Sequence, residues 1–171
     1  MKMDLPVLLI ALALSAAVQN LLPGMPGSPL KIPFLSAVAI YCALNRPLVP
    51  AMTVAIWAGW LTDSAGGLPN SCTATFLLLL TLALRPLRRM LLDGAFPGVV
   101  VAATVMAPLQ ALWQLAWARL AMPDNGWRAV GDVALLLPAG GVAGAAAVAL
   151  FRTLDRWAGN VKRTESVHGV Y

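Results

Sequence analysis

Three long runs without a charged residue limit what this chain can fold into: residues 5–30, 94–118 and 133–151. Each run is close to or above the roughly 20 residues that a helix needs to cross the hydrocarbon core of a bilayer. Of the 171 residues, 60% are hydrophobic and only 11% are charged, whereas a soluble domain carries roughly 25% charged residues. The sequence therefore predicts an integral membrane protein with almost nothing left over for a soluble domain.

The apolar segments, separated by polar or proline- and glycine-rich breaks, predict an all-α bundle of about six transmembrane helices. The expected helices are residues 5–22, 32–44, 48–62, 71–84, 96–118 and 133–151. We expect residues 1–151 to form one polytopic transmembrane domain and residues 152–171 a short basic cytoplasmic tail. Two alternatives stay open: five spans, with the second or third helix merged or buried, and a cleaved signal peptide in place of the first helix.

The basic residues provide a test of this map, because cytoplasmic segments carry an excess of Lys and Arg. With the N-terminus inside, the outer segments hold only three of the twelve basic residues, namely Lys31, Arg119 and Arg128. Both termini are then predicted to be cytoplasmic. This orientation explains the net charge of +5 better than binding to nucleic acid does. Three tryptophans fall near the predicted outer level: Trp60, Trp117 and Trp127.

The centre of the chain carries a face of small residues that leads into an acid. The residues spaced four apart along it are Ala51, Ala55, Gly59, Asp63, Gly67 and Ser71. Residues four apart share a helix face, and small residues let two helices approach closely inside a bilayer. An acid in such a segment normally faces protein or water. We therefore predict a packed face on the third helix that ends in a buried or half-buried Asp63, with Gly67 and Ser71 beyond the helix end.

No pattern typical of catalysis or metal binding accompanies Asp63. The sequence has no His, Cys and Glu cluster with ligand spacing and no nucleophile elbow, and its one histidine, His168, is expected to be solvated. A carboxylate pair for acid–base chemistry would need Asp124 or Asp132 to fold back onto Asp63. We expect Asp63 to act structurally instead, by capping backbone amides, pairing with a basic residue or contacting a partner helix. No enzyme activity, cofactor or metal is predicted.

Two further patterns predict contacts between helices. Gln110 and Gln114 lie four apart on the fifth helix, where they could line a small-molecule pocket or, as we expect, hydrogen-bond to another helix. On the sixth helix, small residues at spacing four give a smooth face for close packing without indicating its partner. This face consists of Gly140 and Gly144 with Ala143 and Ala147.

The two cysteines have no metal-ligand spacing and are expected to be small buried hydrophobic residues. Cys42 falls near the inner end of one expected helix and Cys72 near the outer end of another. A disulfide needs Cα atoms within about 7 Å of each other. We therefore predict no disulfide between them within one chain.

The stretch from Asn45 and Arg46 through the Gly59–Asp63–Gly67 spacing to the apolar fourth helix resembles the MreD family of rod shape-determining proteins. The family signature in this region is a glycine, an aspartate four residues on, a glycine four further and often another glycine four beyond. Here Ser71 replaces the last glycine. The likeness extends along the chain in layout, with a proline-containing first loop, a basic segment after the fourth helix and a short basic tail.

The resemblance implies a non-enzymatic component of the bacterial inner membrane. It would bind the bitopic protein MreC and work indirectly with MreB, a RodA-type glycosyltransferase and a penicillin-binding transpeptidase in side-wall peptidoglycan synthesis and cell shape. It also implies a fold similar to the six-helix substrate-binding subunits of energy-coupling-factor vitamin transporters. Such a vitamin-binding subunit is the main alternative, with an outward pocket lined by Gln110, Gln114 and tryptophans.

Overall fold

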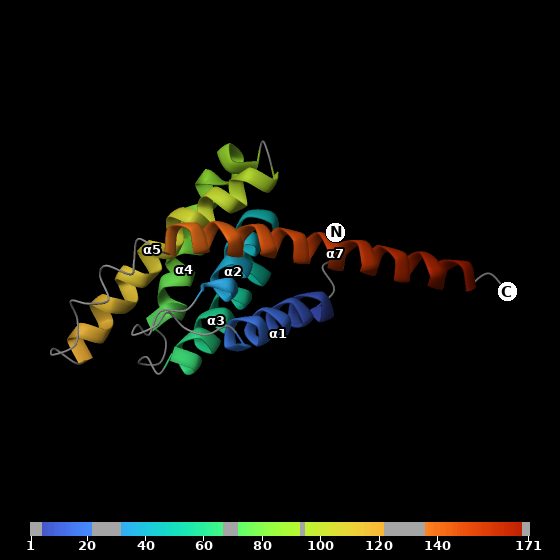
Figure 1. Cartoon of the computed structure of the whole chain (residues 1–171). Helices are drawn as coiled ribbons and strands as arrows, with labels where there is room; N and C mark the ends of the chain where they lie inside the picture. Colours follow the sequence, from blue (N-terminus) through green and yellow to red (C-terminus); the bar gives the residue numbers. More distant parts are fainter. Residues whose placement is uncertain (1–4, 22–31, 67–71, 93–94, 122–135, 169–171) are drawn as a thin grey trace.

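The computed structural model describes residues 5–21, 32–66, 72–92, 95–121 and 136–168, and all of its described elements are helices (Figure 1). They are α1 (Leu5–Leu21), α2 (Phe34–Asn45), α3 (Leu48–Gly66), α4 (Cys72–Leu92), α5 (Ala95–Ala121) and α7 (Leu136–His168). The predicted all-α class and the six helices are therefore confirmed within the described part of the chain. Two of these helices are long and apolar enough to cross a membrane, over residues Pro97–Trp117 and Leu136–Trp157.

The predicted end of the third helix, residue 62, is four residues too early, because α3 runs to Gly66. Two further predicted ends are wrong at the boundary between apolar and basic sequence. The fourth helix does not stop at residue 84 but continues through Pro86 to Leu92. The last helix does not stop at residue 151, and the predicted basic tail continues it without a break to His168. The physical reason is the same in both cases. A change from apolar to polar residues marks a change of surroundings, while the helix itself persists as long as its backbone hydrogen bonds can form.

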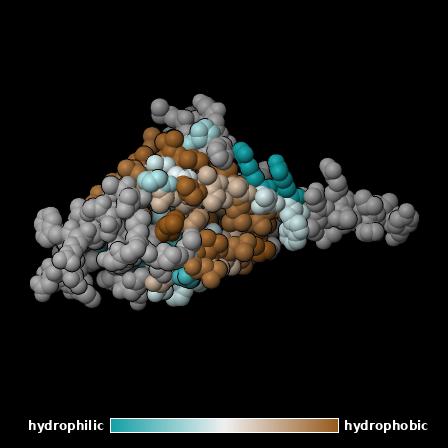
Figure 2. Space-filling view, in the orientation of Figure 1, coloured by the Kyte–Doolittle hydropathy of each residue, from teal (hydrophilic) through white to brown (hydrophobic). Residues whose placement is uncertain are grey.

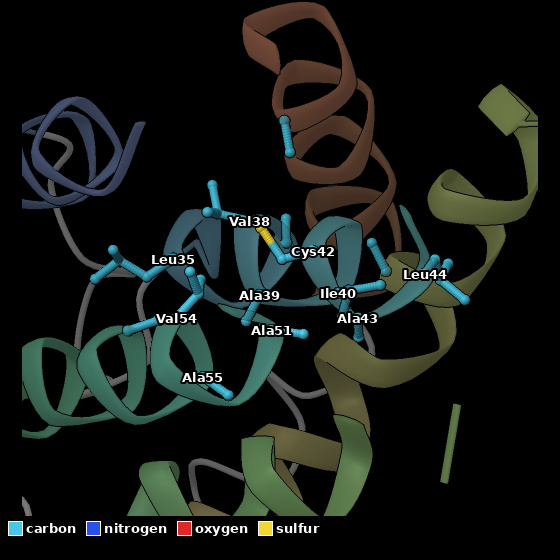
Figure 3. Close-up of a cluster of buried hydrophobic side chains, with 14 of the residues drawn as sticks. Leu35, Val38, Ala39, Ile40, Cys42, Ala43, Leu44, Ala51, Val54 and Ala55 are labelled. Atoms are coloured by element: carbon cyan, nitrogen blue, oxygen red, sulfur yellow. The ribbon is translucent and has the colours of Figure 1, made fainter. Parts of the chain in front are cut away.

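Helix α2 lies at the centre of the bundle and contacts α1, α3, α4, α5 and α7. Nine of its twelve residues are buried, which is the pattern of a helix enclosed on all sides. In Figure 3 the labelled side chains of α2 point in several directions, and those of α3 lie beside them. The buried core formed here consists largely of Leu, Val, Ile and Ala, so the short second helix is a core helix.

The exterior is apolar over much of its area, as the brown surface in Figure 2 shows. Large hydrophobic side chains point outward from α1, α3, α4, α5 and α7. On α3, for example, Trp57 is 53% exposed and Trp60 48% exposed. An outer surface this rich in apolar side chains is unusual for a soluble monomer.

Candidate functional site: a buried carboxylate between three helices

The predicted small face of α3 lies against the protein interior. Ala51, Ala55 and Asp63 are each 0% exposed, and Gly59 is buried between them. Helix α3 extends to Gly66, so Asp63 sits inside the last turn of the helix and not beyond its end. The Asp63 carboxylate thus lies at the end of the tightly packed face of α3, next to α4.

Gly59 makes the closest backbone approach in this region. A Cβ atom added to Gly59 would collide with the Cα and N atoms of Ala74 and would lie 2.8 Å from its Cβ. Backbone atoms cannot rotate away as the end of a flexible side chain can, so any side chain at position 59 would force α3 and α4 apart. Glycine is therefore required here by the distance between the two helices.

Asp63 caps the start of α4. The backbone N–H of Thr73, the second residue of α4, donates to both carboxylate oxygens, at 3.1 Å to Oδ1 and 2.9 Å to Oδ2. The first amides of a helix have no partner within the helix, and they form the positive end of its dipole. A carboxylate supplied by the preceding helix satisfies the amide and is itself stabilised by the dipole. Among the three structural roles left open for Asp63, this geometry supports capping.

Helix α5 joins the same site. The Gln114 amide Nε2 donates to Thr73 Oγ1 at 2.9 Å, and the Trp113 Nε1 donates to the Cys72 carbonyl at 3.0 Å. The prediction that Gln114 bonds to another helix is confirmed, and the helix is α4. The start of α4 is thus held by α3 through Asp63 and by α5 through Gln114. We call the residues Gly59, Asp63, Thr73 and Gln114 the α4 clamp.

Gln110 has a different position from Gln114. It lines a small crevice between α2, α5 and α7, together with Ser36, Ala107 and Gly140. The crevice leaves essentially no space for a water molecule, whereas pockets for small-molecule ligands are about 300–1,000 Å³. The ligand pocket that was the alternative for Gln110 is therefore not found in this crevice.

The small face of the last helix packs on α5. A Cβ added at Gly140 would lie 2.6 Å from both the Ala103 carbonyl oxygen and the Ala107 Cβ, and one at Gly144 would lie 2.8 Å from the Ala103 Cβ. Ala143 and Ala147 on the same helix are buried. The close packing predicted for this face is confirmed, and its partner is α5.

A second polar site, whose contacts the sequence analysis did not predict, lies at the opposite end of α2, α3 and α4. Arg46 ends α2 and is 5% exposed. Its Nη2 forms an ion pair with Asp155 of α7, at 3.1 Å and 3.0 Å from the two carboxylate oxygens. Arg85 of α4 donates from Nη2 to the Arg46 carbonyl at 3.1 Å. Beside this site the rings of Tyr41 and Phe151 stack at 4.2 Å.

Sequence analysis also missed Gln19. It is 3% exposed, and its Oε1 accepts from the backbone N–H of Leu35, the second residue of α2, at 3.1 Å. Gln19 lies near the end of α1, just before a proline- and glycine-rich connection, as Asp63 lies near the end of α3. That shared position, a polar residue at the end of an apolar run ahead of a turn, is the signal that could have identified it.

Several predicted residues are placed less fully. Gly67 and Ser71 lie outside the described residues, as do Asp124 and Asp132, the two acids that the alternative of a carboxylate pair with Asp63 would need. Cys42 and Cys72 are both buried and free. Within the described part of the chain, no three His, Cys, Asp or Glu side chains lie close enough to hold a metal ion.

In comparisons with known proteins, no family model, no curated protein and no solved structure matches this chain.

Proposed function

We propose that this chain is a multi-pass protein of the bacterial inner membrane that acts, as MreD proteins do, as a non-enzymatic component of the cell-elongation complex. Its partner would be an MreC-like bitopic membrane protein, through which it would act on MreB, the RodA-type glycosyltransferase and the penicillin-binding transpeptidase. All six described helices would cross or enter the bilayer, with both termini in the cytoplasm. The proposal rests first on the spacing of Gly59 and Asp63.

The α4 clamp supports this reading of the motif. Gly59 lies against the backbone of Ala74, and Asp63 accepts from the amide of Thr73. Each of these two motif residues therefore has a physical reason to be the residue it is: one for close approach and one for capping. A motif that fixes the angle between two helices fits a protein whose task is to hold partners in a defined arrangement.

The exterior supports the membrane placement. Leu9, Leu79, Val105 and Val142 are examples of large apolar side chains that are 47–63% exposed on four different helices. In a bilayer these side chains would contact lipid tails, so that they would not be exposed to water. Trp60 and Trp117 are 48% and 42% exposed, close to the clamp end, where interfacial tryptophans are expected.

The test is depletion of this protein in its rod-shaped host. We expect the cells to become round and the recovery of MreC in membrane complexes to fall. Complementation with the wild-type chain should restore both. Gly59→Leu, which would collide with the backbone of Ala74, should not restore them, whereas Ala65→Leu, at an exposed position of the same helix, should. Cells that kept their shape but lost uptake of one vitamin would replace this proposal with the transporter-subunit alternative.

A further inference from the structure

One exposed tryptophan lies at an unusual depth for this residue. Trp57 is at the midpoint of the 19-residue helix α3 and is 53% exposed. The helix is about 28 Å long, close to the roughly 30 Å of the hydrocarbon core, so position 57 lies near the middle of the bilayer when α3 crosses it. The Cα–Cβ bonds of a helix tilt toward its N-terminus, which for α3 is the predicted inner end. Tryptophans of the aromatic belts lie at the two membrane surfaces, so that role does not account for Trp57.

The indole N–H of Trp57 has no acceptor among the described residues. The Trp57 ring makes an edge-to-face contact with Trp60, with ring centroids 5.7 Å apart, and this is its one polar or aromatic contact with the described part of the chain. Trp113, by contrast, donates its Nε1–H to the Cys72 carbonyl at 3.0 Å. Lipid tails offer no hydrogen-bond acceptor, and an indole N–H removed from water usually finds one. The free N–H of Trp57 therefore indicates that a protein group covers α3 at this depth.

Trp57 belongs to a continuous exposed stripe on the outer side of α3. Helical periodicity places the members of this stripe on one side of the helix, and each of them is exposed. We call them the α3 stripe: Val49, Thr53, Ile56, Trp57, Trp60 and Ser64. The hydroxyl groups of Thr53 and Ser64 donate to carbonyl oxygens of their own helix, so they need no partner from outside. The α3 stripe is thus an apolar surface with an indole N–H as its unsatisfied donor.

We propose that the α3 stripe docks the single transmembrane helix of the MreC-like partner, which supplies a hydrogen-bond acceptor to Trp57 Nε1 inside the bilayer. The chemistry of that helix follows from the stripe. Small residues let it approach the two indoles closely, and a hydroxyl, a side-chain amide or a free carbonyl level with Trp57 accepts the N–H. One crossing helix matches the stripe, which is a single helix wide and about 22 Å long over residues 49–64. The inference rests on the proposed function, both for the partner and for the crossing of the bilayer by α3.

The experiment measures binding between this full-length chain and the full-length MreC-like protein of its host, both purified and reconstituted in liposomes. Fluorescence energy transfer between dyes on the two proteins gives the affinity. We expect Trp57→Ala to weaken binding at least about thirtyfold, the loss typical of an aromatic hot spot. Trp57→Phe keeps an aromatic ring but loses the N–H, and should weaken binding about threefold, as expected for one hydrogen bond between membrane helices. Leu112→Ala on α5, where Leu112 is 46% exposed, is the matched control and should bind like wild type.

Each other outcome overturns the docking site in a recognisable way. If Trp57→Ala bound the partner as tightly as Leu112→Ala does, the partner would dock elsewhere, and the proposed function would stand without this site. If energy transfer instead appeared between two copies of this chain and was lost in Trp57→Ala alone, the α3 stripe would be a surface for self-association and the assigned occupant would be wrong. If the wild-type chain did not bind the MreC-like protein at all, the proposed function would fail together with the inference. Thermal unfolding of each variant alone should match wild type, because the side chains changed are exposed.

Discussion

In both helix pairs, α1–α2 and α3–α4, a side chain of the first helix caps the start of the second, but the two caps differ in chemistry. In each pair a buried polar side chain near the end of the first helix accepts from the second amide of the next helix. Gln19 does this for Leu35 with one amide oxygen, and Asp63 does it for Thr73 with two carboxylate oxygens. The α3–α4 pair has in addition the glycine contact between Gly59 and Ala74.

This difference indicates which of the two helix pairs contributes more to the stability of the fold. A neutral amide satisfies one orphan N–H, whereas a carboxylate also interacts with the helix dipole, which typically contributes about 0.3–1 kcal/mol. The carboxylate is also the more demanding choice, because a fully buried charge that loses its partner is strongly destabilising. We therefore expect substitutions in the α3–α4 pair to cost more than equivalent substitutions in the α1–α2 pair.

The largest effect is expected for Gly59→Leu. The new side chain would start against the backbone of Ala74 and force α3 and α4 apart, at a cost of at least about 3 kcal/mol. The free energy of unfolding of the purified protein in mixed micelles, titrated with SDS, measures this. Ala65→Leu is the control, since it adds the same side chain at an exposed position of the same helix. Equal stability of the two variants would contradict the close approach of α3 and α4.

Asp63→Leu comes next. It leaves the Thr73 amide enclosed without an acceptor, and we expect a loss of about 2 to 3 kcal/mol. Asp63→Asn keeps one acceptor oxygen and should cost less than about 1 kcal/mol, because Asn and Asp cap helices comparably. The same SDS titration distinguishes the two. If Asn were as harmful as Leu, the negative charge of Asp63 and not its capping bond would be the important feature.

Gln19→Leu sharpens the comparison between the two pairs. It removes the acceptor for the Leu35 amide and should cost about 1 kcal/mol, clearly less than Asp63→Leu. Gln19→Asn, whose shorter side chain retracts the acceptor oxygen, serves as the companion variant and should fall between Leu and wild type. A loss for Gln19→Leu that matched or exceeded that for Asp63→Leu would show that the Gln19 cap contributes at least as much as the Asp63 cap.

The smallest effect is expected for Gln114→Leu. This change removes the bond from Gln114 Nε2 to Thr73 Oγ1, and side-chain hydrogen bonds between membrane helices contribute about 0.6 kcal/mol each on average. A double-mutant cycle with Thr73→Val isolates the pair. Coupling indistinguishable from zero would mean that α5 holds the start of α4 through Trp113 alone.

Local spacing predicted much of this architecture. Residues four apart gave the buried face that ends at Asp63, the bond from Gln114 to another helix and the smooth face of the last helix, because helical periodicity places such residues together whatever the tertiary structure. The helix that packs against each face could not be predicted, since spacing within one helix contains no information about its neighbour.

The second polar site, at Arg46 and Asp155, could not be predicted from local patterns. Arg46 and Asp155 are separated by 109 residues, and each has an ordinary explanation on its own, one as an orientation signal and the other as part of a polar tail. The helical state of that tail was missed for a related reason. Hydropathy reports where a helix leaves apolar surroundings, and α7 remains helical to His168 after it has done so.

The separations of these contacts along the chain also imply an order of assembly. The caps at Gln19 and Asp63 link residues only 16 and 10 positions apart, so each pair can close soon after its second helix has been synthesised. The Arg46–Asp155 ion pair needs α7, which follows the other five described helices along the chain. This ion pair at the end of the central helix α2 can therefore form only after all six described helices have been synthesised.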